Sequence, residues 1–67
     1  MNLKIELERE ADDRWIAEVM ELPGCLAYGE TRASALAKAK ALALRVLADR
    51  MEHGEPVPAG DELFSIA

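Results

Sequence analysis

A tight turn followed closely by a helix start constrains the fold of this chain more than any other feature. Pro23 and Gly24 are typical of the two central positions of a type II β-turn, where proline presets φ and glycine supplies a positive φ. Seven residues after Gly24, the side chain of Thr31 can accept a hydrogen bond from a free N–H at the start of an Ala-rich helix. One short strand, over 25–29, fits between the turn and the helix.

Two further strands are expected before the turn. Leu3, Ile5 and Leu7 alternate with charged residues, which is the period-two pattern of a strand with one buried face. The polar segment 10–13 predicts a hairpin loop that leads into a second strand over 14–21. The chain therefore begins with an antiparallel hairpin.

The second strand divides into a buried face and an open face. Its alternate residues form two sets, with Trp15, Ala17 and Val19 in the first and Ile16, Glu18 and Met20 in the second. Because a buried carboxylate is costly, the set that contains Glu18 belongs with solvent or a partner. The first set is placed on the core.

A helix is expected over 32–53, since its Ala, Leu, Lys and Arg residues favour that conformation. Gly54 is expected to end it and Pro56 to prevent its continuation. The residues at the three-and-four spacing of a buried stripe are Leu36, Ala39, Ala43, Val46 and Leu47.

The predicted fold is a two-layer α+β arrangement, β-β-β-α-β, in which a mostly antiparallel sheet packs one helix on one face. A fourth strand is expected over 62–66, with Phe64 and Ile66 on the same face. If this strand runs parallel to the first, the right-handed crossover rule predicts the strand order 3-2-1-4. Residues 1–67 are expected to form a single domain.

One helix covers only one face of a four-stranded sheet. Ile16 and Met20 would then be apolar side chains on the uncovered face. A chain of this size buries only about 60% of its unfolded surface, so its core is thin. These features predict a homodimer or a higher even oligomer.

Charge and composition exclude several classes of protein. Residues 1–31 contain three basic and eight acidic side chains, whereas residues 32–53 contain five basic and two acidic ones. An acidic strand block repels nucleic acid and attracts basic proteins, so direct nucleic-acid binding is not expected. The alternative interpretation of the acidic block is a well-solvated surface that binds no partner. With no signal peptide and no long apolar span, the expected location is the cytoplasm, away from membranes.

No residue pattern indicates catalysis, a metal ion or a cofactor. Cys25 has no Cys or His at ligand spacing and is interpreted as a small apolar filler. His53 gains from the dipole at a helix C-terminus, which explains its presence. Glu6 and Glu8 raise the alternative of a metal-dependent nuclease, but such a site needs several converging carboxylates. We therefore predict a protein that is not an enzyme.

The motifs Leu22-Pro23-Gly24-Cys25 and Gly29-Glu30-Thr31, followed by an Ala-rich helix and a Pro-containing tail, resemble the small HicB-like antitoxin family. The resemblance covers nearly the whole chain. Ser34 departs from the family pattern, which usually has an acidic residue there, and this weakens the capping box. The resemblance implies a truncated ribonuclease H-like fold. It also implies that the chain acts like the antitoxin of a HicA/HicB-type toxin–antitoxin system, which binds and masks a small basic toxin that cleaves messenger RNA.

Longer members of that family have a DNA-binding module after this domain, and none is expected in this chain. The expected function is non-enzymatic protein binding. The alternative is a stand-alone oligomeric protein of the same fold with another interaction role. The residues expected to bind a partner are Glu6, Glu8, Ile16, Glu18, Met20 and Tyr28.

Overall fold

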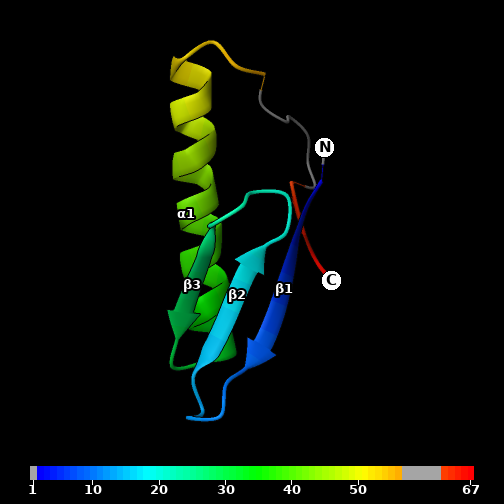
Figure 1. The fold of residues 1–67 in the computed structure, drawn as a ribbon, viewed down its shortest axis with the longest axis vertical. Helices are drawn as coiled ribbons and strands as arrows, with labels where there is room; N and C mark the ends of the chain where they lie inside the picture. Colours follow the sequence, from blue (N-terminus) through cyan, green and yellow to red (C-terminus); the bar gives the residue numbers. More distant parts are fainter. Residues whose placement is uncertain (1, 57–62) are drawn as a thin grey trace.

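The computed structural model describes residues 2–56 and 63–67, which form a four-stranded sheet with one helix packed on it (Figure 1). The elements are β1 (Leu3–Arg9), β2 (Trp15–Val19), β3 (Leu26–Gly29), α1 (Arg32–Glu52) and β4 (Phe64–Ile66). The strand order is β3-β2-β1-β4, with β4 parallel to β1 and the other pairs antiparallel. The predicted α+β class, element order and strand order are confirmed.

The turn between β2 and β3 has the geometry that its proline and glycine predict. Gly24 has a φ of 81°, the positive value expected at the third position. The backbone N–H of Cys25 donates to the carbonyl of Leu22 at 2.9 Å and closes the four-residue turn. The N–H of Val19 donates to the carbonyl of Cys25 at 2.9 Å, so antiparallel pairing resumes directly after the turn.

The start of α1 is capped as expected. Thr31 has an extended backbone, and its Oγ1 accepts a hydrogen bond from the N–H of Ser34 at 3.0 Å. The helix ends at Glu52, one residue before the predicted limit, and His53 is the C-cap.

Among the described residues, no helix combines the length and the apolar character that crossing a membrane requires.

Some strand limits differ from the predicted ones by one or two residues. β2 ends at Val19 rather than 21, because the carbonyl of Val19 already accepts a hydrogen bond from the N–H of Leu22 at 3.1 Å and the chain turns there. β3 begins at Leu26 rather than 25. β4 covers 64–66 of the predicted 62–66, and position 62 lies outside the described residues.

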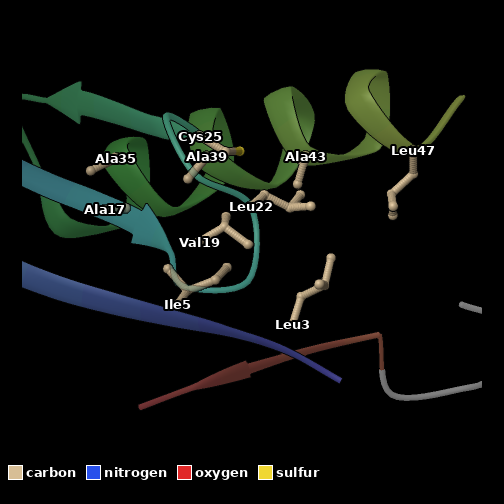
Figure 2. Close-up of a cluster of buried hydrophobic side chains, with 10 residues drawn as sticks. All are labelled: Leu3, Ile5, Ala17, Val19, Leu22, Cys25, Ala35, Ala39, Ala43 and Leu47. Atoms are coloured by element: carbon tan, nitrogen blue, oxygen red, sulfur yellow. The ribbon is translucent and has the colours of Figure 1, made fainter. Parts of the chain in front are cut away.

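The sheet contributes the larger side chains of the core (Figure 2). Leu3, Ile5 and Val19 are fully buried on the face that α1 covers, and Ala17 lies beside them. Trp15 is half-buried against this cluster. The assignment of the Trp15 set to the core is therefore confirmed, as is the period-two burial of β1.

The helix contributes mainly alanines. The buried residues of α1 recur at a four-residue spacing and are Ala35, Ala39, Ala43 and Leu47. Sequence reasoning placed Leu36 and Val46 in this row, but both are only half-buried at its margin. Small side chains face the sheet because they let the helix axis approach it closely, while larger ones pack at the sides.

Cys25 belongs to this core. Its side chain is buried, and burial raises the pKa of the thiol above its ordinary value. We expect a thiol reagent to label the folded protein at least about ten times more slowly than the urea-unfolded chain, because both access and ionisation are restricted. Equal labelling rates would contradict the buried position.

The raised pKa also has a consequence for stability. The Cys25 thiol contributes fully to the free energy of unfolding at pH values below the pKa that this thiol has in the unfolded chain. That contribution is lost as the pH rises through the higher pKa of the thiol in the folded protein. Urea unfolding at about pH 8 and about pH 10 should therefore show a larger alkaline loss in the native chain than in Cys25→Ala. The same loss in both proteins would assign it to other groups.

Candidate functional site

The face of the sheet that lies opposite the buried core and α1 is here called the open face. Since Leu3, Ile5, Ala17 and Val19 point inward, the residues between them project to the opposite side. The open face consists of Lys4, Glu6, Glu8, Ile16, Glu18, Leu26, Tyr28 and Ser65.

The strand register arranges this face in two rows. One row runs from Glu8 through Ile16 to Tyr28, and the other from Glu6 through Glu18 to Leu26. Each row begins with a glutamate on β1 and ends with a large apolar side chain on β3, of which Leu26 is 37% and Tyr28 43% exposed. We call Glu6, Glu8 and Glu18 the acidic side and Ile16, Leu26 and Tyr28 the apolar side.

The acidic side holds like charges in direct opposition. Glu6 and Glu18 are register partners, and carboxylates placed opposite one another across two strands destabilise a sheet. Within residues 2–56 and 63–67, the ion pairs and the His contact join other side chains, namely Arg9–Asp13, Arg14–Asp12 and His53–Asp49. The negative charge of the acidic side is therefore not neutralised by an ion pair in this part of the chain.

The apolar side ends at a tyrosine ring that lies against a cation. The Arg14 guanidinium lies 4.9 Å from the centroid of the Tyr28 ring, and its Nε donates to Oδ2 of Asp12 at 2.8 Å. Desolvation alone would raise the pKa of Asp12, but hydrogen bonds from the backbone and side chain of Arg14 outweigh it and lower that pKa. An open hollow of about 360 Å³ lies beside this pair, with Glu10 and Ala11 completing its lining.

Met20 extends the open face beyond the end of β2. Its N–H donates to the carbonyl of Lys4 at 2.9 Å, which continues the β1–β2 pairing by one step and points its side chain to the same side as Glu18. The side chain is 48% exposed.

The six residues that the sequence singled out thus share one surface. Ile16 differs from the other five because its side chain is half-buried. Sequence reasoning missed Leu26, although its alternation with the buried Cys25 and its spacing of two from Tyr28 would have placed it on the same face.

The residues considered for catalysis do not converge. Glu6 and Glu8 are exposed on one strand, and His53 lies at the far end of α1, where its Nδ1 is 2.7 Å from the carbonyl of Asp49. The part of the chain that the structure describes contains no group of three or more His, Cys, Asp or Glu side chains that could hold a metal ion.

Comparisons of this chain with protein-family models, curated proteins and solved structures found no match. Membership of the HicB-like antitoxin family therefore stays a prediction from the turn and helix-start motifs, the Ala-rich helix and the Pro-containing tail.

Proposed function

We propose that this chain is a non-enzymatic protein-binding module whose open face binds a basic protein. The observation that carries the proposal is the adjacency of unneutralised carboxylates and exposed large apolar side chains on one face of the sheet. Protein interfaces combine an apolar centre with polar groups around it, and complementary charge speeds association.

The Glu6–Glu18 opposition supports a basic partner in particular. Two carboxylates held opposite each other cost stability in the free protein. A lysine or arginine that binds between them relieves this repulsion, so part of the binding free energy is the removal of an internal cost. Nucleic acid would increase the repulsion instead, because its phosphates carry the same sign of charge.

The resemblance to HicB-like antitoxins supplies the kind of partner. By that resemblance, the basic protein is a small RNA-cleaving toxin, and binding would mask it. A second candidate function is a stand-alone oligomer, which is favoured by the exposed apolar side chains of Met20, Leu26 and Tyr28.

Neutralising the acidic side should affect stability and binding in opposite directions. We expect the double variant Glu6→Gln and Glu18→Gln to raise the free energy of unfolding by about 0.5 kcal/mol, or about 2–4 °C in Tm. If a basic protein is encoded beside this gene, the same variant should bind it about ten times more weakly in titration calorimetry.

The matched control removes two charges elsewhere. Glu52→Gln with Glu55→Gln changes exposed glutamates at the end of α1 and just beyond it, and should leave both quantities close to the native values. Equal affinity of the two double variants would contradict binding through the acidic side. No binding of the neighbouring protein at about 100 µM would reject toxin masking and leave the stand-alone oligomer.

A further inference from the structure

β3 is an edge strand, and the hydrogen bonds beside the turn determine which of its backbone groups point outward. The N–H of Val19 donates to the carbonyl of Cys25, so Cys25, Ala27 and Gly29 direct their backbone groups toward β2. The N–H and C=O groups of Leu26 and Tyr28 consequently point away from β2. In the described chain, β3 pairs with β2 alone, which leaves these four groups at the margin of the sheet (Figure 1).

This edge has few of the features by which proteins prevent pairing with another chain. β3 reads Leu26-Ala27-Tyr28-Gly29 and contains no charged residue and no proline. Both of its outward-facing residues have exposed side chains on the apolar side. An uncharged edge next to exposed apolar side chains is a template for another strand.

We propose that two copies of this chain pair through β3 in antiparallel orientation, which joins their sheets into one sheet of eight strands. A two-fold axis at Ala27 sets Leu26 of one copy opposite Tyr28 of the other. Each such pair exchanges two hydrogen bonds, so the four outer groups of each strand are all satisfied. The Leu26 and Tyr28 side chains become cross-strand neighbours on the open face.

The charges at the strand ends are compatible with this axis. It sets Glu30, the first residue after β3, level with Gly24 of the second copy, so no like charges are opposed at that position. A second hollow lies at this end of β3, and Glu30 shares its lining with two cationic side chains, Arg14 and Lys38. The pairing also brings the two apolar sides together at the centre and leaves each acidic side at a distance from the axis.

The other edge of the sheet fits a second copy less well. The N–H of Leu3 donates to Leu63 and the N–H of Ala67 to Ile5, so Phe64 and Ile66 direct their backbone groups outward from β4. β4 has three residues against the four of β3. A dimer through β4 is therefore a distinct possibility, and proline variants at the two edges distinguish it from a dimer through β3.

This interface does not depend on the proposed binding of a basic protein, since it uses backbone groups of the β3 edge and leaves the acidic side accessible. Its test needs only the purified chain. Light scattering at about 10–100 µM should give twice the 7.4 kDa chain mass. A mass of one chain over this whole range would overturn the proposal.

Amide hydrogen exchange locates the interface without any mutation. In the dimer, the amides of Leu26 and Tyr28 should exchange at least about ten times more slowly than on dilution to monomer, whereas Ala27, already paired with β2, should change little. A dimer in which the Leu26 and Tyr28 amides remain unprotected would overturn pairing through β3.

Two proline variants at the two edges give the matched comparison. Leu26→Pro removes an outward N–H from β3, and Ile66→Pro removes an outward N–H from β4, so neither change deletes a ladder hydrogen bond within the chain. Circular dichroism should show that both remain folded. We expect Leu26→Pro to raise the dimer dissociation constant at least about ten-fold and Ile66→Pro to leave it unchanged. The reverse result would assign the dimer to β4 and overturn the proposal.

Discussion

Replacing Ile5 with alanine is expected to lower the free energy of unfolding by about 2–5 kcal/mol. Ile5 is fully buried between α1 and the sheet, so the change removes apolar contacts and leaves a cavity that the short strands cannot close. A chain of 67 residues has a total stability of about 3–10 kcal/mol, so this single substitution should remove a large fraction of it. Urea unfolding followed by the fluorescence of Trp15, the one tryptophan, measures the loss.

The matched control is Ile66→Ala. Ile66 is the register partner of Ile5 on β4, but it is 50% exposed at the edge of the sheet. The same substitution there should lower the free energy of unfolding by less than about 1 kcal/mol. The reason is that folding removes less of the apolar surface of Ile66 than of Ile5 from contact with water. Similar losses for both variants would contradict the placement of the core under β1.

Replacing Gly29 with alanine is expected to cost about 3 kcal/mol, although it adds a single methyl group. A Cβ at this position would lie 2.9 Å from Cα of Ala35 and still closer to the Ala35 nitrogen. These are backbone atoms of the first turn of α1, so no side-chain rotation relieves the overlap and the helix must move away from β3. Thermal unfolding should show a Tm lower by about 12–24 °C.

Gly24→Ala separates this steric cost from the cost of backbone conformation. A Cβ at Gly24 meets no atom within 4 Å, but the φ of 81° is unfavourable for alanine. The expected loss is about 1–2 kcal/mol. If Gly29→Ala were as mild as Gly24→Ala, the close approach of α1 to β3 would be wrong.

Local chemistry explains what could be predicted about the fold. Pro23-Gly24 restricts backbone dihedrals within four residues, and Thr31 caps a helix through a hydrogen bond to a residue only three positions away. The alternation of Leu3 and Ile5 with charged residues likewise needs no distant partner to define a strand. For the same reason, alternation placed all six expected partner-binding residues on one face.

Distances between elements explain what could not be predicted. Helical periodicity admits Leu36 in the buried row, but the helix lies so close to the sheet that Ala35 occupies that place. The requirement for Gly29 arises from backbone contact with α1, which no pattern within β3 encodes. The direct opposition of Glu6 and Glu18 depends on the β1–β2 register.

The sequence by itself determined the order of elements, the turn, the helix start and the side of each strand that faces water, because these depend on dihedral preferences and periodicities within a few residues. Only the tertiary structure decided how near α1 lies to β3, which carboxylates face each other and that β3 ends the sheet with unpaired backbone groups. Those features are distances between residues far apart in the chain, and packing of the whole core sets them.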